Sequence, residues 1–226
     1  MSLEEKYTTL TSEKIPNVFS SGIASGFANG KTEGIEEGKQ AEYDAFWDEF
    51  QNKGGAMNYQ YTFAYSHFTD KNYNPKYPIK CTNTTTGGRY LFYQSQITDT
   101  KVTIYAGTTN INYMFADADK LKIIRLLSVY ESTTYSNTFT GCSELEEITF
   151  EGTIGTAISF APCTKLSVDS MKNIISCLKN YIGTSNEGAN KVTFASDCWT
   201  RLEASGVAPN GGTWKDYVEH SLGWNI

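Results

Sequence analysis

Four stretches of the chain align with one another: LFYQSQITDTKVTI (91–104), MFADADKLKIIRL (114–126), TFTGCSELEEITF (138–150) and SFAPCTKL (159–166). Each stretch has a phenylalanine at its second position, and these phenylalanines are 23, 24 and 21 residues apart: Phe92, Phe115, Phe139 and Phe160. A small residue follows three positions after each of them, as a tight corner requires: Ser95, Ala118, Cys142 and Cys163. One unit holds a short strand and a turn and cannot bury a core alone, so the repeat predicts that successive units stack.

Each unit ends on two apolar residues separated by one position, which is the pattern of a strand with one buried face. The equivalent pairs are Val102/Ile104, Ile124/Leu126, Ile148/Phe150 and, later in the chain, Val192/Phe194. We expect the alternate residues to point outward and to form a candidate binding surface: Lys101, Thr103, Ile123, Arg125, Glu147, Thr149, Lys191 and Thr193. At loop positions beside this surface, Tyr105, Tyr130 and Tyr135 offer amphipathic contact area. A solvated sheet face that binds no partner is the alternative interpretation.

The last of these strands, at 191–194, is expected to pair in parallel with the strand at 145–150. If the two strands adjoin, the opposite charges of Glu147 and Lys191 are able to pair. Between them, Ser167 can cap a helix that carries Met171 and Ile174 on its apolar face.

The pattern F-x-x-C-x-x-L-x-x-I-x-F resembles the BspA-like leucine-rich repeats of bacterial surface proteins, and Phe139 to Phe150 is its best copy. The resemblance implies an α+β repeat fold: a leucine-rich-repeat solenoid of parallel strands at 91–195, followed by a helical C-terminal cap at 196–226. An aromatic-rich irregular cap at 52–90 precedes the solenoid, and a long Gly-rich helix is expected within an N-terminal attachment segment at 1–51.

That N-terminal segment carries a glycine at every fourth position: Gly22, Gly26, Gly30, Gly34 and Gly38. Five glycines inside a helix cost about 4–5 kcal/mol relative to alanine. Close approach of a second helix would offset this cost, so the pattern predicts that the chain associates with itself as a homo-oligomer, for example a trimer. A flexible linker in front of an ordered element at Phe46 and Trp47 is the alternative.

Composition argues against several classes of function. The net charge of −6 and the pI near 5.0 leave no basic field for phosphate neutralisation, so we expect no nucleic-acid partner. Apolar stretches such as 123–129 fall far short of the ~20 residues that span a bilayer, so we expect no membrane span.

We also expect no catalytic residue, no cofactor and no metal, and hence no enzyme. The two histidines, His67 and His220, have no evident partners, and the five cysteines are too widely spaced for metal-binding pairs. Solvated turn carboxylates are favoured over a calcium site at Asp117 and Asp119, because no third ligand follows them. The thiols of Cys142 and Cys163 form either a packed column or a disulfide.

The segment 30–51, GKTEGIEEGKQAEYDAFWDEFQ, resembles a segment of tail-associated proteins of phages and prophages of gut anaerobic bacteria. This resemblance implies a non-enzymatic structural and binding protein of the virion tail, made in the host cytoplasm, that serves host attachment or virion assembly. Its partner would be a protein or glycan on a cell surface. The alternative is a BspA-like adhesion or protein-interaction module, which would be extracellular on a bacterial cell surface.

The stacking hypothesis predicts different costs for two substitutions in one unit. Phe139→Ala should lower the free energy of unfolding by about 3–5 kcal/mol, because it leaves a cavity between coils. Thr149→Ala, on the outward face, should change it little. Thermal denaturation of both variants is the measurement, and similar losses in the two would contradict the inward and outward assignment.

Overall fold

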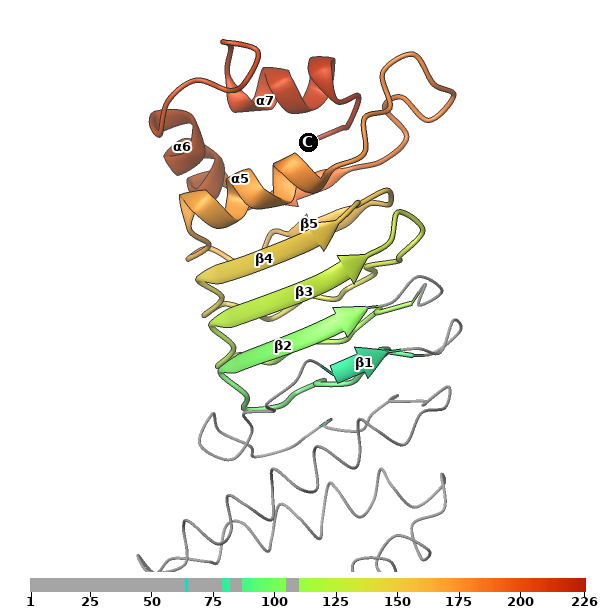
Figure 1. Cartoon of the computed structure of the whole chain (residues 1–226). Coiled ribbons are helices and arrows are strands. Elements are labelled where there is room, and N and C mark those ends of the chain that lie inside the picture. The colour runs from blue at the N-terminus through green and yellow to red at the C-terminus, as the bar shows by residue number, and fades with distance from the viewer. Residues whose placement is uncertain (1–63, 65–78, 82–86, 105–109) are drawn as a thin grey trace, which may run out of the picture.

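The computed structural model describes residues 64, 79–81, 87–104 and 110–226, whose arrangement is shown in Figure 1. The predicted N-terminal segment at 1–51, including its glycine stripe, lies outside the described residues, as does most of the predicted cap at 52–90. The described chain winds as a stack of parallel coils, in which each coil consists of one strand and one return run of tight turns (Figure 1).

One side of the stack is a four-stranded parallel sheet in the order β1 (Ile79–Cys81), β2 (Asp99–Ile104), β3 (Ile123–Val129) and β4 (Glu147–Gly152). Each strand begins one coil after the last, so neighbours run in the same direction. On β3 and β4 the apolar alternation holds as predicted, because Ile124, Leu126, Ile148 and Phe150 are all buried.

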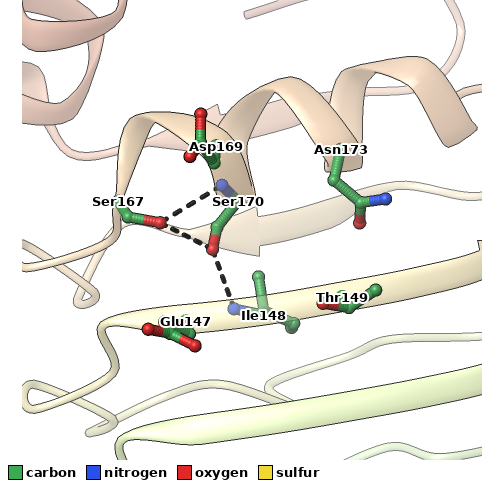
Figure 2. Close-up of a pocket in the computed structure, with 7 residues that line it drawn as sticks. All are labelled: Glu147, Ile148, Thr149, Ser167, Asp169, Ser170 and Asn173. Carbon is green, nitrogen blue, oxygen red and sulfur yellow. Dashed lines mark hydrogen bonds between the residues drawn. The ribbon is translucent and has the colours of Figure 1, made fainter.

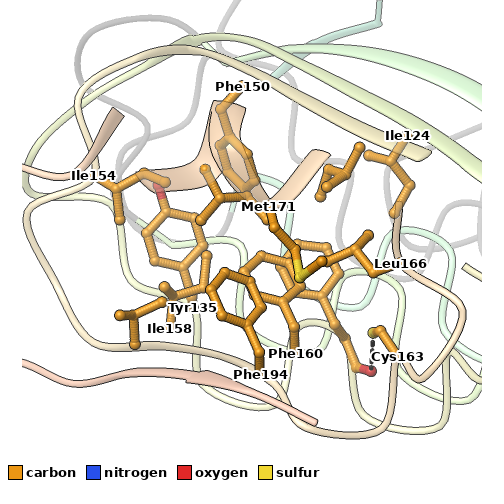
Figure 3. Packing of buried hydrophobic residues seen from close by; sticks show 14 of the residues in the cluster. Ile124, Tyr135, Phe150, Ile154, Ile158, Phe160, Cys163, Leu166, Met171 and Phe194 are labelled. Carbon is orange, nitrogen blue, oxygen red and sulfur yellow. Dashed lines mark hydrogen bonds between the residues drawn. The ribbon is translucent and has the colours of Figure 1, made fainter. Parts of the chain in front are cut away.

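The predicted phenylalanine stack is confirmed. Ring centroids are 5.6 Å apart between Phe92 and Phe115, 6.0 Å between Phe115 and Phe139, and 4.7 Å between Phe139 and Phe160. The stack continues for one more ring than the alignment indicated, since Phe194 lies 5.7 Å from Phe160. Figure 3 shows this end of the stack inside the buried cluster. We call these five rings the phenylalanine ladder.

The return runs that carry the first three rings of the ladder are hydrogen-bonded from coil to coil. The amide of Phe92 donates to the Met114 carbonyl at 2.7 Å, and the amide of Phe115 donates to the Thr138 carbonyl at 3.1 Å. Two left-handed backbone positions recur in each run: Tyr90, Tyr113 and Asn137 at the first, and Gln94, Asp117 and Gly141 at the second. A left-handed backbone conformation costs roughly 1–2 kcal/mol for most residues other than glycine. Stacking of the Tyr90 and Tyr113 rings, whose centroids are 4.8 Å apart, offsets part of this cost.

Short helices complete the C-terminal end: α5 (Val168–Cys177), α6 (Ser196–Ala204), α7 (Trp214–Asp216) and the π-helical turn η2 (Tyr217–Ser221). A second parallel sheet pairs β5 (Ile158–Phe160) with β6 (Val192–Phe194). Both strands carry rings of the phenylalanine ladder, so this sheet continues the return side of the stack.

The predicted fold class is wrong. Neither a long helix nor a leucine-rich-repeat solenoid is present among the described residues: their longest helix, α5, has 10 residues, and their parallel strands divide between two separate sheets. The physical reason on the return side is the recurring left-handed backbone, which ends any helical run and imposes tight turns.

The predicted pairing of 191–194 with 145–150 is also wrong, because β6 pairs with β5. Instead, α5 covers the outer edge of β4 (Figure 1). Ser170 Oγ accepts a hydrogen bond from the Ile148 amide at 2.9 Å. The side chain of Asn173 hydrogen-bonds both backbone groups of Phe150. Asn173 Oδ1 accepts from the Phe150 amide at 2.7 Å, and Asn173 Nδ2 donates to the Phe150 carbonyl at 3.2 Å. These side chains satisfy backbone groups that would otherwise form an open sheet edge.

Asn173→Leu should therefore destabilise the protein by about 2 kcal/mol, because it leaves the Phe150 amide without a partner and the Phe150 carbonyl with only the Cys177 thiol, 3.5 Å away. Ser176→Leu, at an exposed position of the same helix, is the matched control. Urea unfolding followed by circular dichroism compares the two variants. Equal losses would mean that the edge contact contributes nothing beyond helix propensity.

Candidate functional site

Six of the predicted surface residues come from one continuous sheet. Lys101 is in register with Arg125, and Arg125 with Thr149. Ile123 is likewise in register with Glu147, while Thr103 is opposite Leu127. Glu147 and Thr149 are exposed, and Ile123 and Arg125 are half-buried. We call Ile123, Arg125, Glu147 and Thr149 the sheet face.

The other predicted residues do not join the sheet face. Thr193 is part of β6, and Lys191 directly precedes it, so both belong to the separate two-stranded sheet and the predicted Glu147–Lys191 pair does not form. Tyr135 was expected at the surface but is only 3% exposed, because its ring packs edge-on against Phe150 at 6.2 Å. Tyr130 is 49% exposed, as expected of a contact residue, and Tyr105 lies outside the described residues.

A cleft of about 480 Å³ opens where the sheet face meets α5. Figure 2 shows its lining side chains, which come from β4 and from the first turns of the helix: Glu147, Ile148, Thr149, Ser167, Asp169, Ser170 and Asn173. Of these seven residues, only Glu147 and Thr149 are among the binding residues that the sequence predicts. The helical half was missed because the crossing of α5 over β4 has no counterpart in the repeat.

Most polar atoms of the helical half of the cleft already serve the fold. Ser167 Oγ accepts a hydrogen bond from the Ser170 amide at 3.2 Å, which confirms the predicted helix cap, and Ser170 and Asn173 hold the edge of β4. The other polar residues that line the cleft are Glu147, Thr149 and Asp169, all of which are exposed. The cleft can therefore bind through hydrogen bonds and negative charge.

Neighbouring carboxylates are paired between coils. Glu144 accepts from Lys165 Nζ at 2.6 and 2.7 Å, and this hydrogen bond lowers the pKa of the Glu144 carboxyl below its usual value. Lys122 lies 3.7 Å from Glu146. These exposed pairs contribute little stability each, but they neutralise the acidic residues that precede Glu147.

The residues considered for other chemistry have ordinary partners. Asp117 accepts from Gln94 Nε2 at 3.5 Å, and Asp119 lies 3.4 Å from Lys120. Within the described ranges there is no cluster of three or more potential metal ligands. His220 Nδ1 lies 3.1 Å from Asp216 Oδ1 on the exposed end of the chain, and His67 lies outside the described residues.

Cys142, Cys163 and Cys198 form a buried column of free thiols, so of the two alternatives for Cys142 and Cys163 the structure shows the packed column. Cys142 Sγ donates to the Phe115 carbonyl at 3.1 Å, in the coil before it. Burial raises the pKa of Cys142 to about 12, with a smaller contribution from the charge of Asp117, and burial also raises the pKa of Cys163. A thiol that stays protonated is a poor nucleophile.

Comparison of the chain with protein-family models, with curated proteins and with solved structures found no match. In the part of the chain that the structure describes, no helix has the length and hydropathy that crossing a bilayer requires.

The thiol column predicts slow cysteine labelling. At pH 8 the folded chain should react far more slowly with a thiol reagent at Cys142 and Cys163 than at half-buried Cys177, whereas all three should react together in guanidinium chloride. Mass spectrometry of labelled peptides is the measurement, and fast labelling of Cys142 at pH 8 would contradict the assignment.

The raised pKa of Cys142 also makes the stability of the fold depend on pH. The buried, protonated Cys142 thiol contributes its full stabilisation below about pH 9, and this stabilisation is lost as the pH rises towards 12.

Proposed function

We propose that this chain is a non-enzymatic binding protein that contacts its partner through the sheet face and the adjoining cleft. The observation that carries the proposal is the in-register placement of Arg125 and Thr149, and of Ile123 and Glu147, beside a cleft of about 480 Å³. These side chains combine both signs of charge with a hydroxyl and an apolar group. Such a mixture suits the polar surface of a protein or a glycan.

The support beneath this surface favours binding. Directly behind the sheet face, Ile148 and Phe150 point into the core, where Phe150 meets Phe160 edge-on at 6.3 Å. The strands are therefore fixed before any partner arrives. A preorganised surface loses little conformational entropy on binding, which leaves more of the contact energy as affinity.

The resemblance of segment 30–51 to phage tail-associated proteins gives the proposed context. In that context the N-terminal segment joins the chain to its own copies or to the particle, and the coil stack presents the sheet face to a host cell or to another virion component. Host attachment is the form of this proposal that can be tested directly with cells.

The test is the binding of fluorescently labelled full-length chain to whole cells of a panel of gut anaerobic bacteria. Thr149→Arg places a bulky cation on the sheet face beside Arg125 and at the cleft, and should weaken cell binding at least about tenfold, equivalent to a loss of about 1.4 kcal/mol. Thr140→Arg adds the same side chain at an exposed position of a return run and is the matched control. Melting temperatures of both variants establish that each is folded.

If Thr149→Arg binds cells as tightly as Thr140→Arg does, the sheet face is not the contact surface. Absence of binding to every strain tested would reject host attachment.

A further inference from the structure

The connection between α6 and α7 contains the dipeptide Asn210-Gly211. In an unrestrained chain this pair rearranges spontaneously, because glycine leaves its own backbone nitrogen open to the preceding side chain. The Gly211 nitrogen attacks Asn210 Cγ, a C–N bond forms, the Gly211 proton is lost, and ammonia leaves with the former side-chain nitrogen. Water then opens the succinimide ring to give aspartate or isoaspartate at position 210.

The structure engages three polar atoms that take part in this reaction. Asn210 Nδ2, the leaving nitrogen, donates to Asp216 Oδ2 at 3.2 Å and to Ser221 Oγ at 3.1 Å. Asn210 Oδ1 accepts from the Gly212 amide at 3.0 Å. The attacking nitrogen of Gly211 donates to the Ala208 carbonyl at 2.8 Å, and Gly211 has a φ of 82° that suits glycine.

The groups that hold the asparagine come from the C-terminal helical turns. Asp216 is fixed by its backbone amide, which donates to Thr213 Oγ1 at 3.1 Å, and by its Oδ1, which lies 3.1 Å from His220 Nδ1. Ser221 is the last residue of η2. A carboxylate at position 210 would face Asp216 Oδ2 at the distance now spanned by the Asn210 hydrogen bond, and the two like charges would repel.

We propose that Asn210 is a latent deamidation site that Asp216 and Ser221 keep closed in the folded protein. Reaction requires the connection to open away from α7 and η2. The product then opposes reclosure, because aspartate at position 210 repels Asp216. Deamidation at this position marks molecules whose C-terminal segment has opened.

The experiment incubates the full-length chain at pH 8 and 37 °C and follows the mass gain of the peptide that contains Asn210. Deamidation should be at least about tenfold slower in the native protein than in guanidinium chloride, since the connection must open first. The second Asn-Gly pair of the sequence, Asn29-Gly30, calibrates the intrinsic rate in the denatured chain.

Ser221→Ala should raise the native rate at Asn210 about fivefold, which is the effect of losing one hydrogen bond worth about 1 kcal/mol. Ser143→Ala, at an exposed serine in the corner that precedes β4, should leave the rate unchanged. Equal rates in the native and denatured protein would overturn the proposal. An unchanged rate in Ser221→Ala, with its melting temperature preserved, would also overturn it.

Discussion

The contact on which the structure depends is the stacking of one phenylalanine of each coil on the phenylalanine of the next. The four centroid distances along the ladder lie between 4.7 and 6.0 Å, so one matches the ~4.8 Å that separates neighbouring strands and the other three are about 1 Å longer. The rings of successive coils therefore stay in contact on the return side while backbone hydrogen bonds set the spacing on the sheet side. Along the chain, successive rings are 21 to 24 residues apart from Phe92 to Phe160 and 34 residues apart from Phe160 to Phe194, because the excess is taken up in connections and in α5 rather than in the ladder.

Sequence periodicity predicts those features of the fold that recur in each coil with the same side chains. The ladder and the buried alternation of β3 and β4 are of this kind, whereas the Ser167 cap was predictable from the capping serine and the helical pattern that follows it. The left-handed positions were missed because Tyr90 and Tyr113 stand where the backbone favours glycine or asparagine. Phe194 was assigned to the sheet side because its Val-Thr-Phe context fits a strand in either sheet. Tyr135 was assigned to the surface because its loop position gave no sign of Phe150 beside it.

The candidate site lies where the repeat stops. Within the stack, each strand is satisfied by the backbone of its neighbour, so the coils offer little beyond a flat face. At β4 the neighbour is a helix, and the change from strand to helix leaves the cleft that Glu147 and Asp169 line. No periodic argument locates such a feature, because it depends on Ser170 and Asn173 reaching Ile148 and Phe150 across 22 and 23 residues.

Helix α5 also limits where further coils can be added to this protein during evolution. A coil added by duplication after β4 would have to displace α5, because Asn173 already occupies the backbone amide and carbonyl of Phe150. An extra coil inserted between β2 and β3 meets no such obstacle, since it would find a backbone partner on either side. Longer descendants of this chain should therefore have gained units in their interior, with the helical terminus carried along unchanged.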